Sequence, residues 1–177
     1  MMALHGNKTD RIIAYVLEHP EAPIKVIAIA NALKVNKGSV SLAIKKLEAI
    51  KVVKNKLVDL STPLTRALKI LAIVTSITDA KAINVINRYA IAAGLYGSSA
   101  KGTNTEESDI DIWIRPKHGT SQLKVAELSR TLSMMLHKRV QIVMVNEKRL
   151  AAIKEENPNF YYALVFGSIV LLGEGIE

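Results

Sequence analysis

Apolar residues in the first sixty positions recur at the three- and four-residue spacing of amphipathic helices. The first such stretch contains Ile12 and Val16 and ends before Pro20, with Thr9 as its expected N-cap. A second stretch covers residues 24–35. The third, which Asn36 opens, runs to Ile50. Residues 52–58 then predict a short hairpin that turns at Asn55-Lys56. The pattern indicates three helices followed by a hairpin.

The rest of the chain alternates helical and strand-like patterns. Ser61-Thr62-Pro63 is typical of a helix start, with Pro63 at the first helical position and Ser61 or Thr62 as the cap. Expected helices cover residues 63–79, 79–89, the region from Leu123 to Met135, and residues 147–156. Apolar runs of strand length cover residues 91–96, 110–114, 139–145 and 168–173. This order predicts the α+β class.

The stretch from Gly97 to Ile114 carries the strongest chemical signal. The apolar run 91–96 ends at Gly97-Ser98, as expected where a strand turns sharply into a helix. Glycine lets the backbone approach a phosphate, the free N–H groups of the turn point at it, and the Ser98 hydroxyl adds a hydrogen bond. The turn is therefore a candidate anion site.

Two carboxylates follow on the next apolar run. Residues i and i+2 of a strand share one face, so Asp109 and Asp111 project together while Ile110, Ile112 and Ile114 enter the core. Clustered carboxylates repel each other unless a cation lies between them. Beside a phosphate site, the natural cation is Mg²⁺, which favours one or two carboxylates together with phosphate oxygens.

These motifs resemble the signature of polymerase-beta-type nucleotidyltransferases, especially the small prokaryotic minimal members. The matching residues are Leu95-Tyr96-Gly97-Ser98-Ser99-Ala100-Lys101-Gly102 and Ser108-Asp109-Ile110-Asp111, with Ser99 in place of a basic residue. The resemblance covers residues 80–177 and implies a small mixed sheet flanked by helices. It implies ATP or another nucleoside triphosphate as substrate or ligand, one or two Mg²⁺ ions, and transfer of a nucleotidyl group to a hydroxyl.

The resemblance also assigns roles to individual residues. Gly97, Ser98, Lys101 and Gly102 are the expected nucleotide-binding residues, and Asp109 and Asp111 are the expected catalytic residues and metal ligands. The minimal subgroup further implies an antitoxin-like role beside a HEPN-type toxin encoded as a separate chain.

One position departs from the family pattern. The strand 139–145 should lie beside the Asp109 strand and normally delivers a third carboxylate, but here Gln141 occupies that position. An amide is no base and binds Mg²⁺ more weakly than a carboxylate. Glu147 lies past the strand end and is a poor replacement. An alternative function is therefore a degenerate, nucleotide-sensing, DNA-binding transcriptional regulator.

The N-terminal pattern resembles the winged helix-turn-helix module, although Lys51 occupies a position where glycine is usual. Expected DNA-binding residues are Lys37, Ser39, Ser41, Lys45, Lys46, Lys54 and Lys56. Leu42, on the outer face of the third helix, favours a protein-docking module instead, because base edges and phosphates need polar partners. The predicted domains are a winged helix at residues 1–62, a connecting helix at 63–79 and a nucleotidyltransferase domain at 80–177.

Composition and charge agree with this picture. The 177 residues are 49% hydrophobic and 23% charged, which excludes extensive disorder, and the absence of cysteine excludes disulfides and thiolate zinc sites. Residues 1–62 hold ten Lys or Arg against five Asp or Glu, so much of the net charge of +8 lies there and favours a nucleic-acid partner. We expect a cytoplasmic protein without a membrane partner. The apolar stripe of the 63–79 helix is wide enough for homodimer contacts.

Overall fold

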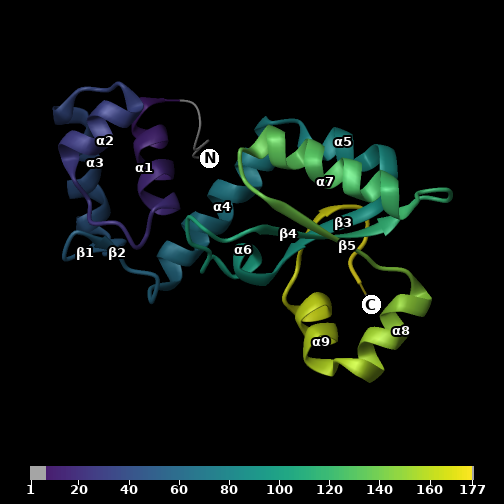
Figure 1. Cartoon of the computed structure of the whole chain (residues 1–177). Coiled ribbons are helices and arrows are strands. Elements are labelled where there is room, and N and C mark those ends of the chain that lie inside the picture. The colour runs from purple at the N-terminus through teal and green to yellow at the C-terminus, as the bar shows by residue number, and fades with distance from the viewer. Residues whose placement is uncertain (1–6, 177) are drawn as a thin grey trace. The chain divides into compact units, whose positions relative to one another are not determined.

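The computed structural model describes residues 7–176, which form two compact units (Figure 1). The first unit extends to Thr75 and also includes Gly102–Glu107, whereas the second comprises Ser76–Lys101 and the chain from Ser108 onward. The division at Thr75 falls inside helix α4 (Pro63–Asp79). Within residues 7–176, no single helix is long and apolar enough to cross a membrane. Residues 63–78 and 82–89 reach that length and composition only as a bent pair.

The first unit contains the three predicted helices and the predicted hairpin. Its elements are α1 (Lys8–Glu18), α2 (Val26–Leu33), α3 (Lys37–Ala49), β1 (Val53–Lys54) and β2 (Leu57–Val58). The two short strands pair antiparallel, with Val53 opposite Val58. Residues of the predicted apolar faces, including Ile12 and Val16, are buried in one core together with Val40 of α3. The periodic spacing therefore identified the faces that pack together.

Side-chain caps fix where these helices begin. Asn36 accepts a hydrogen bond from the Ser39 amide at 2.7 Å, and Thr62 accepts one from the Thr65 amide at 3.2 Å, as the sequence indicated. The prediction of Thr9 as the first cap is wrong. Asn7 accepts from the Asp10 amide at 3.0 Å, so α1 begins at Lys8 and Thr9 lies inside its first turn.

Three residues of the hairpin region have left-handed backbone. Lys51 has φ 60°, and the turn residues Asn55 and Lys56 have φ 52° and 61°. Two consecutive residues with positive φ make the primed turn that matches the twist of a two-residue hairpin. A non-glycine residue with positive φ, such as Lys51, is strained by about 1 kcal/mol.

The second unit is built on a four-stranded mixed sheet. Its strands are β3 (Ala90–Tyr96), β4 (Ile110–Pro116), β5 (Val140–Met144) and β6 (Ile169–Leu172). They follow the order β5-β4-β3-β6, with β4 and β5 parallel and the other two pairs antiparallel. The expectation that the strand containing Gln141 lies beside the carboxylate strand is confirmed. The small mixed sheet flanked by helices is likewise as expected.

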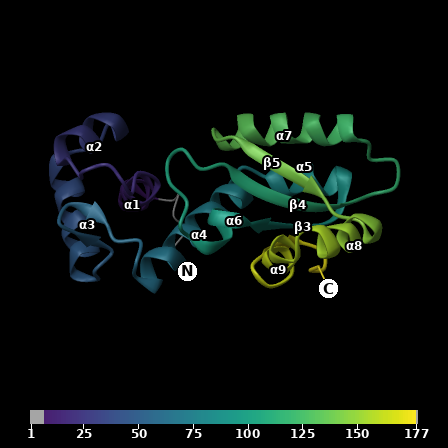
Figure 2. The ribbon, with the colours of Figure 1, turned by 60° about the horizontal axis from the view of Figure 1, so that its bottom comes forward.

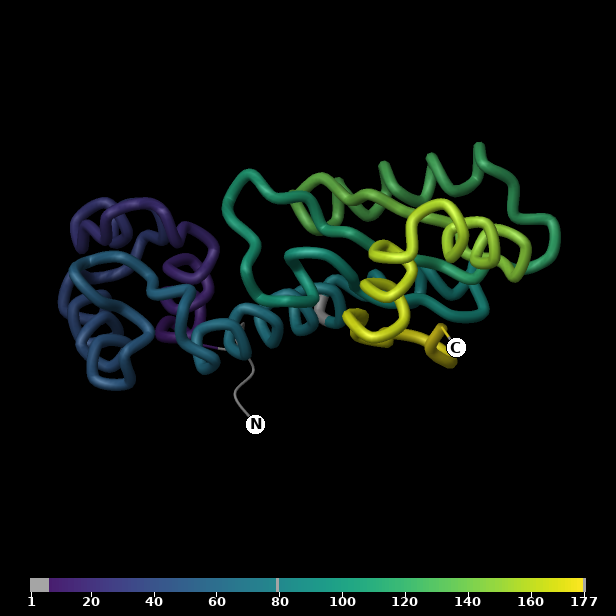
Figure 3. Tube along the Cα trace, turned by 90° about the horizontal axis from the view of Figure 1, so that it is seen from below, coloured from purple at the N-terminus to yellow at the C-terminus, as the bar shows by residue number. Residues whose placement is uncertain are grey.

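Helices cover both faces of this sheet (Figure 2). Helices α5 (Ala82–Tyr89) and α7 (Gln122–Leu136) pack on one face, while α8 (Glu147–Glu156) and α9 (Pro158–Phe166) lie on the other, nearest the viewer in Figure 3. The helix expected from Asp79 begins three residues later. Helix α9 was not predicted, although Asn157 caps it and Pro158 takes its first position. Its apolar residues surround the helix axis and give no helical period.

The segment Gly102–Glu107 belongs to the first unit although both its neighbours in sequence belong to the second. Gly102 is buried and has φ 65°, and a Cβ built on it would lie 2.2 Å from the Arg66 carbonyl oxygen of α4. Asn104 is buried, and Glu106 lies 3.5 Å from Nε2 of His19 in an ion pair. Backbone packing against α4 therefore holds this segment.

Replacing Gly102 by alanine should destabilise the first unit by about 2–4 kcal/mol, because left-handed strain adds to a collision with backbone atoms that cannot rotate away. Gly119→Ala is the matched control. Gly119 has φ 78° and nothing within 4 Å of the new Cβ, so this variant should lose only about 1 kcal/mol of unfolding free energy. Urea unfolding followed by circular dichroism compares the two. Equal losses would contradict the close packing of Gly102.

Candidate active site in the second unit

Three neighbouring strands place a row of polar side chains on one face of the sheet. Tyr96 of β3 pairs in register with Asp111 of β4, and Asp111 pairs with Gln141 of β5. Residues in register share a face, and Asp109 joins them because it precedes Asp111 by two positions. Trp113, two residues on, is buried in the core that α8 and α9 cover. The row therefore lies on the face of α8 and α9.

Gly97 brings the end of β3 against this row. It begins the short helix α6 (Gly97–Lys101) with φ 67°, and a Cβ built on it would lie 2.5 Å from Oδ2 of Asp111. Any side chain at position 97 would displace the carboxylate and strain the backbone. The glycine thus allows the backbone of the predicted phosphate turn to lie directly beside Asp111.

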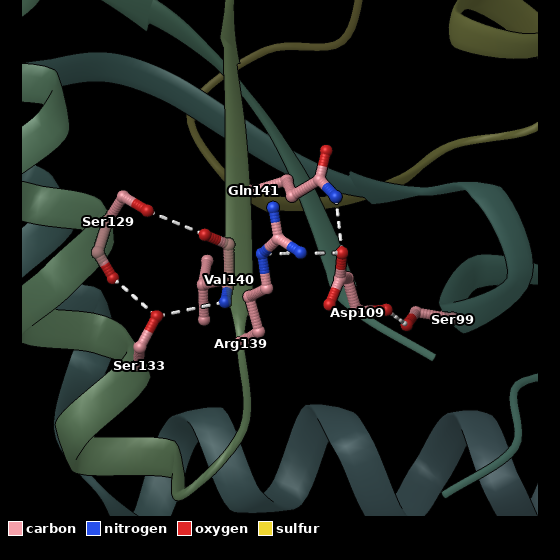
Figure 4. Close-up of polar contacts among 7 residues, drawn as sticks. All are labelled: Ser99, Asp109, Ser129, Ser133, Arg139, Val140 and Gln141. Atoms are coloured by element: carbon pink, nitrogen blue, oxygen red, sulfur yellow. Dashed lines mark hydrogen bonds and ion pairs between the residues drawn. The ribbon is translucent and has the colours of Figure 1, made fainter. Parts of the chain in front are cut away.

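Asp109 is contacted from both sides (Figure 4). Nε2 of Gln141 donates a hydrogen bond to Oδ2 of Asp109, and Nε of Arg139 lies 3.7 Å from the same oxygen. On the other side, the Ser99 hydroxyl donates to the Asp109 carbonyl oxygen at 3.4 Å. The Arg139 side chain is 76% exposed. At that exposure its ion pair contributes at most about 1 kcal/mol.

The two carboxylates differ in their electrostatic surroundings. Burial, and secondarily the charge of Asp109, raise the pKa of Asp111 above its usual range. Burial, with a smaller contribution from Asp111, raises the pKa of Tyr96 to about 12. Neither ion pair found among residues 7–176 involves Asp111. Asp111 is thus the group in the row whose negative charge most needs a cation.

The donor set fits one Mg²⁺ ion. Asp109 retains Oδ1, and both Asp109 and Asp111 stand on one face, which matches the one or two carboxylates that Mg²⁺ takes beside phosphate oxygens and water. Across the described part of the chain, no group of three or more His, Cys, Asp or Glu residues is arranged to hold a metal. Glu147, exposed at the start of α8, therefore supplies no third carboxylate.

The remaining predicted residues fall into two groups. Ser98 follows Gly97 in α6 and is half-buried, and Lys101 is exposed at the other end of that helix. Gly102 lies in the first unit, where its contact with Arg66 already requires a glycine. In the first unit, the side chains of Lys37, Lys45, Lys46, Lys54 and Lys56 are exposed, whereas Ser39 and Ser41 are half-buried.

The sequence reasoning overlooked Arg139. It precedes Gln141 by two residues, so the strand predicted over 139–145 placed both on one face. The alternation of strand residues was therefore the signal that could have identified Arg139. Tyr96 belongs to the motif without an assigned role, and its position in the polar row follows from its pairing with Asp111.

Asp111→Asn should raise the stability of the second unit at pH 7 in buffer containing EDTA. An acid whose pKa is raised by folding binds its proton more tightly in the folded state, so its contribution to stability falls as pH rises between the unfolded and folded pKa values. The gain should therefore shrink as pH is lowered through the raised pKa. The urea midpoints of the variant and the wild type from pH 3 to 7 measure this gain in stability. Asp59→Asn is the control, because the pKa of Asp59 is lowered and its replacement should not stabilise the protein. A stability gain of Asp111→Asn that grew as the pH was lowered would contradict a raised pKa for Asp111.

Residues 80–157 match the family model described as polymerase beta, nucleotidyltransferase. No curated protein matches the chain. Among solved structures, the chain is similar to one from a "Crystal structure of the toxin-antitoxin with AMP-PNP", at 21% identity over 54% of this chain and 73% of that chain, with a TM-score of 0.43. The matched region spans β3, the carboxylates, β5 and α8, and therefore includes the whole polar row.

Proposed function

We propose that the second unit binds a nucleoside triphosphate with Mg²⁺ and transfers a nucleotidyl group from it to a hydroxyl acceptor. One observation carries the proposal: Asp111 of β4 and Asp109, the residue before β4, lie on the same face, and the backbone of Gly97 lies directly against Asp111. The family match at residues 80–157 supports the class of reaction. ATP is the expected donor.

Each residue has a defined task in this proposal. The backbone of Gly97 and Ser98, the Ser98 hydroxyl and the Lys101 ammonium bind the phosphates and orient the chain of the triphosphate. Asp109 and Asp111 hold Mg²⁺, which when bound stabilises the charge that develops on the transferred phosphate and on the departing pyrophosphate. Burial of Asp111 strengthens its attraction for a cation.

The second candidate function is a nucleotide sensor without transfer activity. Its support is the contact between the Gln141 amide and Asp109, since the amide donates a hydrogen bond where a general base would accept one. The acceptor hydroxyl would then lack a group that removes its proton. Nucleotide binding survives in this version, because Asp109 and Asp111 are both present.

We propose that the first unit is a winged helix-turn-helix module that binds double-stranded DNA. Its order of three helices and a hairpin supports this, and its expected phosphate contacts are exposed lysines. Leu42, which is 58% exposed, supports the competing protein-docking function. For the whole chain, the motif resemblance carries the further proposal of an antitoxin-like role with a separate HEPN-type toxin chain.

Transfer of label from α-labelled ATP in the presence of Mg²⁺, with cell extract as acceptor, tests the enzyme. Wild-type labelling should fall by at least about 100-fold in Asp111→Asn, because the metal loses a ligand. Glu147→Gln is the matched control and should label like the wild type, since Glu147 is exposed outside the row.

Gln141→Asp separates the two candidates. If the natural chain transfers, this variant should label at a similar or higher rate. Labelling by Gln141→Asp alone would show that the natural protein is a degenerate transferase and favour the sensor. Absence of labelling in all variants, with nucleotide binding intact, would contradict the proposed reaction.

Duplex binding measured by fluorescence anisotropy across a KCl series tests the first unit. The affinity should fall steeply with salt, and the double substitution Lys45→Gln and Lys46→Gln should lower the slope of log K against log salt by about 2, because each phosphate contact releases counterions. Lys124→Gln and Lys148→Gln, at exposed positions of the second unit, are controls. A flat salt dependence would favour protein docking.

A further inference from the structure

The side of the polar row that faces β5 presents nitrogen donors. Gln141 donates to Oδ2 of Asp109 through its amide nitrogen, and the Arg139 guanidinium lies 3.7 Å from the same oxygen (Figure 4). A metal-binding edge would present oxygen atoms. N–H groups bind anionic oxygens instead, and a guanidinium repels a second cation. This side of the site is therefore suited to an anion.

The opposite is true around Asp111. Its carboxylate is partly buried beside Gly97, and it takes no part in the ion pairs of residues 7–176. The cation requirement of the site thus lies at Asp111 and at the free oxygen of Asp109. A bound cation would therefore be expected toward Asp111, whereas the Arg139 guanidinium lies at Oδ2 of Asp109.

The contact between Arg139 and Asp109 is easily exchanged. A single nitrogen approaches the carboxylate at 3.7 Å, without the paired geometry of a forked contact, and the side chain is 76% exposed. A guanidinium binds a phosphate group with two parallel hydrogen bonds, which are shorter and stronger. A triphosphate beside Asp109 would therefore draw Arg139 away from the carboxylate at little cost.

We propose that Arg139 is a phosphate-binding residue of the nucleotide site, where it supplies a positive charge that makes nucleotide binding partly independent of divalent metal. This inference rests on the proposed nucleotide site. Where the family pattern would place another carboxylate, Gln141 is neutral, and Arg139, the residue before β5, supplies a positive charge instead.

Titration of the full chain with a fluorescent ATP analogue, in Mg²⁺ and in excess EDTA, tests the role of Arg139. The wild type should bind in both buffers, with its Kd rising by no more than about tenfold in EDTA. Arg139→Ala should raise the Kd in EDTA by at least about a further tenfold, with a smaller loss in Mg²⁺. Arg139→Lys should fall between them, because it keeps the charge and loses the fork.

Arg130→Ala is the matched control for net charge. Arg130 is exposed on α7, the helix that covers the other face of the sheet, so its removal should leave both Kd values unchanged. Circular dichroism spectra verify that the variants are folded. Wild-type binding in Mg²⁺ that disappears in EDTA, with Arg139→Ala equal to wild type, would overturn the role of Arg139 and leave the nucleotide site intact. Absence of wild-type binding in both buffers would overturn the nucleotide site and the inference together.

Discussion

Asp109, just before β4, and Asp111 within it place two carboxylates of like charge on one face of the sheet, and the neighbouring side chains neutralise only one of them. The negative charge of Asp109 is partly neutralised by the Gln141 amide and the Arg139 guanidinium. Asp111 is held against Gly97, where burial and its neighbour raise its pKa. The repulsion between the two carboxylates favours cation binding, because a bound cation would reduce that repulsion.

The same arrangement distinguishes the chain from the pattern that its motifs resemble. Where the family pattern has a third carboxylate, β5 carries the Gln141 amide, and Arg139, the residue before β5, places its guanidinium beside Asp109. Both groups donate hydrogen bonds. Neither group can accept a proton from a hydroxyl, whereas both can donate to an anionic oxygen. In the proposed nucleotide site, an amide at position 141 would therefore affect proton removal more than nucleotide binding.

Local pattern predicted much of this structure because local interactions determine it. The three N-terminal helices, the hairpin at Asn55-Lys56 and the shared face of Asp109 and Asp111 follow from periods of 3.6 and 2 residues. Helix α9 was missed because its residues are apolar on all sides. The contact between Arg139 and Asp109 depends on the register of β4 and β5, which links residues thirty positions apart and is not set by either strand alone.

The sequence also did not determine which of two equivalent local signals the structure uses. Asn7 and Thr9 are both good caps, and the structure uses Asn7. Gly102 fits the motif of a phosphate turn, yet its backbone packs on Arg66 in a different unit from Gly97. Such a contact joins distant parts of the chain, so no window of neighbouring residues contains it.

The discontinuity of the first unit has a consequence for how the protein is made. Its core helices and hairpin are complete by residue 60, but the segment Gly102–Glu107, which packs on α4 and pairs with His19, emerges from the ribosome only after β3 and α6 have been synthesised. The N-terminal unit therefore reaches its final form only during synthesis of the second unit. A single truncation point cannot separate the two units, because residues 102–107 of the first unit lie in sequence between Gly97 and Asp109 of the second.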